Sequence, residues 1–132
     1  MSKPYITNIV RQAADNQNFR TVLHTADKSQ LVVMRIEAGE DIGEETHAHV
    51  EQILYFQSGQ GKAVFNGEEF PIGAGDVAIV PPGTKHNFIN TGHEPLVVAT
   101  VYVPPNHLDG TVHHTKAEAL ADTKDEAFGE AV

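Results

Sequence analysis

Two histidines, His47 and His49, form a His-Ala-His pair in a chain that holds 8 histidines among 132 residues. On a β-strand, residues two apart point to the same face, so the two imidazoles would project side by side. A pair of imidazoles arranged in this way suits one transition-metal ion. Chance alone produces about 0.5 such pairs at this histidine frequency, so two surface histidines explain the pair equally well.

A second pattern that could take part in chemistry runs from Gly75 to Asn90 and contains Pro81, Gly83 and His86. The chain's own residue frequencies give these five positions a chance match on the order of one in ten thousand. The pattern predicts a strand, a sharp turn and a second strand. His86 opens that second strand and is expected to aim its side chain inward.

The elements that would position these histidines are predicted to be β-strands. Gly, Pro and Asn turn signals separate seven short runs rich in Val, Ile, Phe and Tyr. Asn66–Gly67 is the strongest hairpin signal, because a type I′ turn needs positive φ at both residues. Even spacing favours a sandwich or barrel, and the connections are too short for the crossover helices of an α/β fold. The predicted strands are Leu31–Ile36, Ile53–Phe56, Lys62–Phe65, Glu69–Ile72, Val77–Val80, Phe88–Ile89 and Leu96–Val103.

On these residues the chain resembles the cupins. The second cupin motif, Gly-x5-Pro-x-Gly-x2-His-x3-Asn, is matched at every fixed position from Gly75 to Asn90. The first cupin motif is matched in part: its two histidines and its closing Gly59 are present, whereas its acid falls on Gln52 and its opening glycine is displaced.

The resemblance covers about residues 31–103, which would form the barrel core of a single domain spanning residues 1–132. It implies an all-β fold, the double-stranded β-helix or cupin jelly-roll barrel. Residues 8–20 are expected to form a short helix or N-terminal arm, and residues 116–132 a short C-terminal helix or tail.

The resemblance also implies a metal held by His47, His49, Gln52 and His86. Glu51 is an alternative to Gln52, because strict alternation from the two histidines puts Glu51 on their face. The count back from Gly59 favours Gln52, provided that the strand bulges. Imidazole ligands favour a divalent transition metal (Fe, Mn, Ni or Zn) over magnesium or calcium. An empty barrel with packed histidines is the alternative.

Several side chains are expected around the metal by strand parity, although each of them fits a plain barrel core equally well. The substrate-pocket candidates are Met34, Leu54, Phe56, Phe88 and Tyr102. Tyr102 and His107 would reach the barrel mouth and supply a proton donor or acceptor there, but His107 also fits a surface loop. No catalytic residue is identified. We expect Glu44–Glu45 to be a solvated charge run and four other histidines to be exposed, namely His24, His93, His113 and His114.

The composition of the chain limits the kinds of molecule that it is expected to bind. Asp and Glu number 18 and Lys and Arg 9, giving a net charge of -9 that counts against nucleic acid and anionic membranes. No apolar run approaches the roughly 20 residues of a membrane span, and the first residues do not resemble a signal peptide. The absence of cysteine excludes disulfides and thiolate sites. We therefore expect a cytoplasmic protein, and exposed strand edges favour a homodimer.

These observations lead to two hypotheses for function. The first is a metal-dependent enzyme that acts on a small polar, oxygen-rich molecule, as an isomerase or epimerase or in a dioxygenase-type reaction. The second is a non-catalytic module that binds or senses a small molecule. The fold does not separate them, because one scaffold hosts many chemistries.

Overall fold

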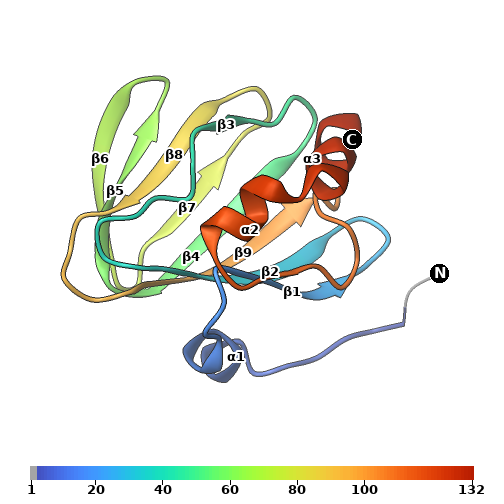
Figure 1. Ribbon diagram of the computed structural model, residues 1–132, viewed down its shortest axis with the longest axis horizontal. Coiled ribbons are helices and arrows are strands. Elements are labelled where there is room, and N and C mark those ends of the chain that lie inside the picture. Colours follow the sequence, from blue (N-terminus) through green and yellow to red (C-terminus); the bar gives the residue numbers. More distant parts are fainter. Residues whose placement is uncertain (1–2) are drawn as a thin grey trace.

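The computed structural model describes residues 3–132, so the first two residues of the expected 1–132 domain lie outside the described part of the chain. Two antiparallel sheets form the body of the molecule (Figure 1), in the orders β10-β1-β2-β9-β4-β7 and β3-β8-β5-β6. This arrangement confirms the all-β prediction. The strands are β1 (Arg20–Thr25), β2 (Gln30–Ile36), β3 (Glu45–Thr46), β4 (Glu51–Ser58), β5 (Gln60–Phe65), β6 (Glu68–Gly73), β7 (Val77–Val80), β8 (Lys85–Asn90), β9 (Leu96–Val103) and β10 (Val112–His113).

Alternation along the strands builds the core between the two sheets. In β4 every second residue is buried, and the same pattern recurs in β8, because side chains of a strand point to opposite faces. Leu54, Phe56 and Phe88 are at most 1% exposed, and the rings of Phe56 and Phe88 lie 5.5 Å apart between centroids. The core therefore joins the strands that carry the two motifs.

Turn chemistry sets the register of the strands. Asn66 and Gly67 have φ of 49° and 85°, as the predicted type I′ hairpin requires. Gly59, between β4 and β5, has φ of +97°, and a Cβ there would lie 2.6 Å from the carbonyl oxygen of Pro95. Glycine is thus needed at Gly59 both for its φ and for the close approach of a neighbouring backbone.

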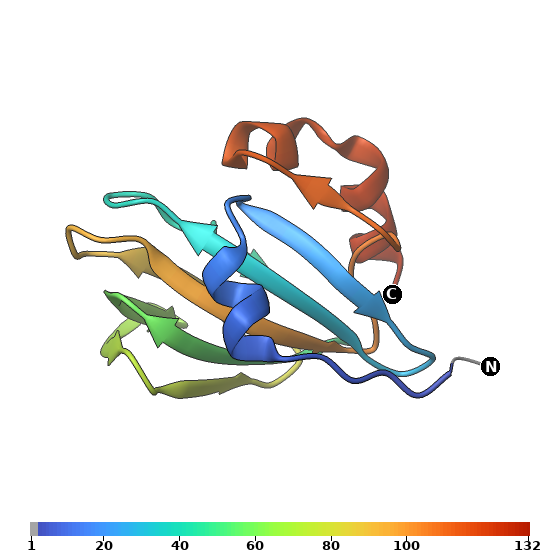
Figure 2. The same ribbon diagram turned by 90° about the horizontal axis from the view of Figure 1, so that it is seen from below.

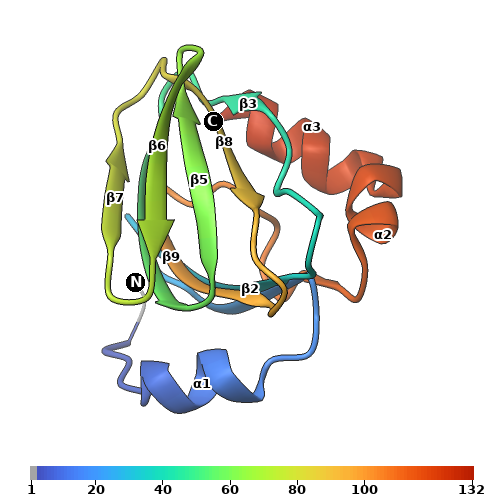
Figure 3. The same ribbon diagram turned by 90° about the vertical axis from the view of Figure 1, so that its left-hand side faces the viewer.

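Helices flank the barrel on two sides. Helix α1 (Ile9–Asp15) begins at Asn8, whose side chain accepts from the Arg11 amide, and it packs on the outer face of the larger sheet through Ala13 (Figure 2). Helices α2 (Lys116–Ala121) and α3 (Thr123–Ala131) lie on another side of the barrel (Figure 3). No helix in residues 3–132 is both long and apolar enough to cross a membrane.

Candidate functional site

One histidine from each motif, His47 and His86, lies beside the other. Strand β3 pairs with β8 so that Glu45 is opposite His86, and His47 follows directly after β3. The rings of His47 and His86 are 5.2 Å apart between centroids. The amide of Gly83 donates to the His47 carbonyl at 2.8 Å, so the turn of the second motif holds the first motif in place.

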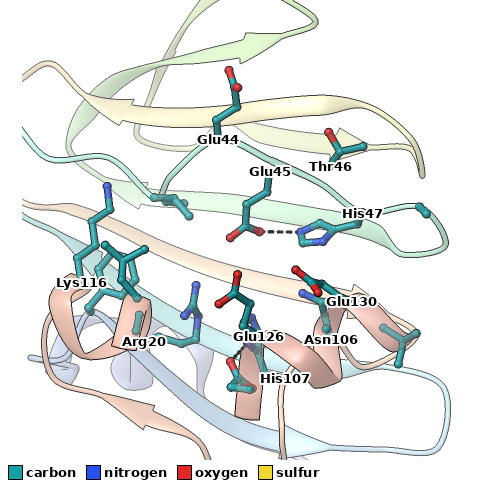
Figure 4. Close-up of a pocket in the computed structure, with 18 residues that line it drawn as sticks. Arg20, Glu44, Glu45, Thr46, His47, Asn106, His107, Lys116, Glu126 and Glu130 are labelled. Carbon is teal, nitrogen blue, oxygen red and sulfur yellow. Dashed lines mark hydrogen bonds and ion pairs between the residues drawn. The ribbon is translucent and has the colours of Figure 1, made fainter. Parts of the chain in front are cut away.

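Glu45 completes a group of three candidate metal ligands. The ligand atoms of Glu45, His47 and His86 all lie within 4.8 Å of one another. The Glu45 carboxylate is 3.0 Å from His47 Nε2 (Figure 4). Glu45 was expected in a solvated charge run. The signal that would have found it is the spacing Glu45-Thr46-His47, which equals the spacing of the His-Ala-His pair.

The surroundings of His86 and Glu45 favour the neutral imidazole and the ionised carboxylate that a metal binds. His86 Nδ1 is 2.8 Å from the carbonyl oxygen of Thr84, which only accepts, so Nδ1 carries the hydrogen and Nε2 keeps its lone pair. Burial lowers the pKa of His86, which leaves the ring neutral at neutral pH. Burial opposes ionisation of Glu45, but the hydrogen bond and charge of His47 outweigh it and lower the pKa of Glu45.

The other predicted ligands occupy different surroundings. His47 lies outside any strand and residues 48–49 form a bend, so the same-face argument does not apply to the pair, and His49 is exposed. Gln52 is 3% exposed, and its Nε2 donates to Thr100 Oγ1 at 3.1 Å. Glu51 is exposed at the start of β4. The ligand roles of His49, Gln52 and Glu51 remain predictions.

All five predicted pocket residues are buried in the core between the sheets. None of Met34, Leu54, Phe56, Phe88 and Tyr102 is among the described residues that line the cavity between the barrel mouth and the C-terminal helices, so their contact with a substrate remains a prediction. Tyr102 lies between the two parts of the site, with its ring centroid 6.2 Å from that of His47 and 4.9 Å from that of His107. Burial raises the pKa of Tyr102 to about 12, so its hydroxyl keeps its proton.

A cavity of about 440 Å³ lies between the barrel mouth and the C-terminal helices. Figure 4 shows Glu45 and His47 on one wall and Arg20, His107 and Glu126 on the other. Its volume falls within the range of roughly 300–1,000 Å³ of small-molecule pockets. The lining residues come from β1, from the segment around β3 and from the chain after β9, so no local spacing in the sequence indicated the cavity.

His107 is held by the last helix. Its Nδ1 is 2.7 Å from Oδ2 of Asp125, and the other carboxylate oxygen of Asp125 accepts from the Leu108 amide at 2.7 Å. His107 is 7% exposed, which corrects the surface-loop alternative. Burial lowers the pKa of His107, although Asp125 opposes this effect, so the ring is neutral at neutral pH.

His113 is buried at 3% exposure, so the expectation of a surface position is wrong. Its strand pairs with β1, which brings His113 Nδ1 to 3.1 Å from Nη1 of Arg20. His113 Nε2 lies 2.9 Å from the Asp122 carboxylate. His113, Asp122 and Asp125 form a second group with ligand atoms within 4.8 Å, but both nitrogens of the His113 ring already have partners.

Comparison with known proteins agrees with the sequence motifs. Residues 32–104 match the family model described as "Cupin domain". The Bacillus subtilis (strain 168) protein YrkC is 42% identical over an alignment of 125 residues, and the match covers 90% of this chain and 67% of that protein. A crystal structure from Bacillus halodurans has a TM-score of 0.88 and 38% identity, and the match covers 90% of this chain and 95% of that chain.

A third match identifies the architecture. The structure of a Klebsiella pneumoniae protein with a double-stranded beta-helix domain has a TM-score of 0.67 and 26% identity over 84% of this chain and 98% of that chain. The predicted double-stranded β-helix is therefore confirmed.

Proposed function

Because the chain belongs to the cupin family, we propose that it is a metal-dependent enzyme that acts on a small polar, oxygen-rich molecule. The reaction is an isomerisation or epimerisation, or an oxidation of the dioxygenase type. The observation that carries the proposal is the meeting of Glu45, His47 and His86 within 4.8 Å beside a cavity of about 440 Å³. A ligand in that cavity would lie next to a metal held by these side chains.

The donor set fits a divalent transition metal. Two imidazoles and a carboxylate suit Fe, Mn, Ni or Zn, and His86 has the backbone hydrogen bond that commonly fixes a metal-binding tautomer. His47 and His86 belong to the ligand set expected from the motifs, and Glu45 competes with His49 for the third place. Gln52 remains the proposed fourth ligand. A bound metal would act as a Lewis acid on a carbonyl or hydroxyl oxygen.

Metal content tests the metal centre directly. We expect near one transition metal per chain in protein purified without chelator, because three ligands already converge. His47→Ala and His86→Ala should lose the metal while the far-ultraviolet circular dichroism stays that of a β-barrel. His93→Ala is the matched control, because His93 is exposed and lies outside the group. Metal-free wild-type protein, or metal retained by both histidine variants, would contradict the proposal.

The second candidate function is a non-catalytic module that binds or senses a small molecule. A cavity of this size can bind a ligand without catalysing a reaction. A screen of metal-loaded protein against sugars, keto acids and diketones separates the two candidates. Oxygen uptake or rearrangement of a compound supports the enzyme. Binding without either change supports the module.

A further inference from the structure

Unpaired polar atoms are concentrated on the cavity wall. In residues 3–132, 5 buried side-chain nitrogen and oxygen atoms lack a hydrogen-bond partner. Three of them, Arg20 Nε, Asn106 Oδ1 and His107 Nε2, belong to residues on one wall of this cavity. A fourth, His47 Nε2, lies on the opposite wall, 3.0 Å from the Glu45 carboxylate. Buried polar atoms are rarely left unpaired in native proteins. Their concentration on one wall indicates a ligand whose own polar groups pair with them.

The hydrogen bond to Asp125 determines what His107 offers to such a ligand. A carboxylate accepts, so the hydrogen of the neutral ring resides on Nδ1 and points to Asp125. Nε2 then carries a lone pair, is buried, and lacks a partner. A side chain of this kind accepts a hydrogen from a hydroxyl group in the cavity. The carboxylate behind the ring also stabilises the imidazolium that forms when the proton is transferred.

Arg20 supplies positive charge on the same wall. It is 5% exposed, and its Nη1 donates to His113 while its Nε–H lacks a partner. Within the described chain, Arg20 has no carboxylate within 4.0 Å. Figure 4 shows Arg20 and His107 on the same side of the cavity. A cationic side chain with one unpaired N–H beside a proton acceptor stabilises an oxygen that gives up its proton.

Carboxylates on the rest of the wall disfavour an anion. Glu44, Glu45, Glu126 and Glu130 all line the cavity, and like charges brought together oppose binding. Carboxylate and amide oxygens accept hydrogen bonds from hydroxyl groups instead. The wall therefore matches a neutral molecule that is rich in hydroxyl groups, such as a polyol or a sugar.

From these contacts we infer that His107 is the proton-accepting catalytic residue of the cavity, that Asp125 is its positioning residue, and that the ligand is a neutral polyol or sugar. In the step, a ligand O–H bond breaks and an Nε2–H bond forms on His107. The electron pair stays on the ligand oxygen beside Arg20. The inference deepens the proposed function, because it names the substrate class and the base of the same site.

Nuclear magnetic resonance of the histidine nitrogens in chelator-treated protein tests the inference. We expect the Nδ1–H tautomer of His107, and a shift of its Nε2 resonance on titration with D-glucose, D-fructose or D-sorbitol. D-Gluconate should bind more weakly than D-sorbitol, because it adds a charge to the same carbon skeleton. An Nε2–H tautomer, or no shift with any of the three neutral compounds, would overturn the inference, as would tighter binding of D-gluconate.

Two variants complete the test. His107→Asn keeps a donor for Asp125 but lacks Nε2, so the tightest of the three compounds should bind roughly tenfold more weakly. Asp125→Asn should change the tautomer of His107, which a purely structural role would not do. His93→Asn is the matched control and should behave as the wild type. If His107→Asn binds the neutral compounds as tightly as the wild type does, the inference is wrong. Because this protein holds no metal during the measurement, a failure here is distinct from a failure of the metal analysis.

Discussion

Glu45 and His49 compete for the same role at the proposed metal centre. Glu45→Gln removes the carboxylate that, among residues 3–132, groups with both histidines within 4.8 Å, so metal affinity should fall by about tenfold or more. His49→Ala should change affinity little, because His49 is exposed. Isothermal titration with zinc measures both changes. A larger loss of zinc affinity in His49→Ala than in Glu45→Gln would instead support His49 as the third ligand. In the same measurement, a larger loss of affinity in Glu51→Ala than in Gln52→Ala would favour Glu51 as the fourth ligand.

Burial of His107 makes the stability of the metal-free protein depend on pH. Its folded pKa lies below the ordinary value of 6.5, so below pH 6.5 the unfolded chain binds more protons than the folded one. Stability therefore falls as pH drops from 6.5 toward the folded pKa. The urea midpoint should decrease over this window, and the decrease should be smaller in His107→Asn than in His93→Asn. Equal slopes in the two variants would contradict this assignment. Asp125, with a pKa below 3.8, contributes only at more acidic pH.

The sequence identified part of the site for physical reasons that are now visible. His86 and Asn90 belong to a motif whose geometry is local: Asn90 Nδ2 donates to the Glu94 carbonyl and Asn90 Oδ1 accepts from the Gly92 amide, which fixes the segment after β8. The proposed base was not identifiable, because His107 and Asp125 lie 18 residues apart and meet only through the tertiary fold. Arg20 was not identified as a site residue either, because the alternation of apolar and polar residues did not reveal the strand in which it lies.

At the scale of elements, glycines at two turns have different roles. Gly75→Ala should cost about 1–2 kcal/mol, because φ is +92° there but nothing lies within 4 Å of the added Cβ. Gly59→Ala should cost roughly 2 kcal/mol more, because its Cβ would also lie 2.8 Å from Leu96 Cα. Urea denaturation measures the difference between the two variants. Equal losses would show that the backbone near Gly59 relaxes without cost.

Most strands were predicted close to their observed positions, because alternation and turn residues are local signals. The strands β3 and β10, each of two residues, carry no detectable period. Strand β1 was missed, since polar residues interrupt its apolar ones. The C-terminal segment was expected to be one short helix or tail. It forms two helices, because Asp122 ends α2 and its side chain accepts from the Asp125 amide at the start of α3.

At the scale of the molecule, an apolar edge favours self-association. Strand β7 is at the end of its sheet, and its Val77 and Ile79 are each 59% exposed. We expect a homodimer, because exposed edges pair with other strands. Ile79→Lys should shift the mass measured by light scattering from dimer to monomer, whereas Leu120→Lys, a change at another exposed apolar residue, should not. A monomeric wild type would contradict the expectation.

The net charge of -9 bears on partners of the whole molecule. It opposes binding to nucleic acid and to anionic membranes through long-range repulsion. The absence of such partners and the cytoplasmic location remain predictions from composition. The small-molecule ligand remains a proposal that depends on the cavity.

The cavity lies between the barrel and the part of the chain that follows it. The family match ends at residue 104, whereas His107 and the C-terminal helices that form one wall follow it. Exchange of residues in that wall would therefore change the lining of the cavity and leave Glu45, His47 and His86 in place.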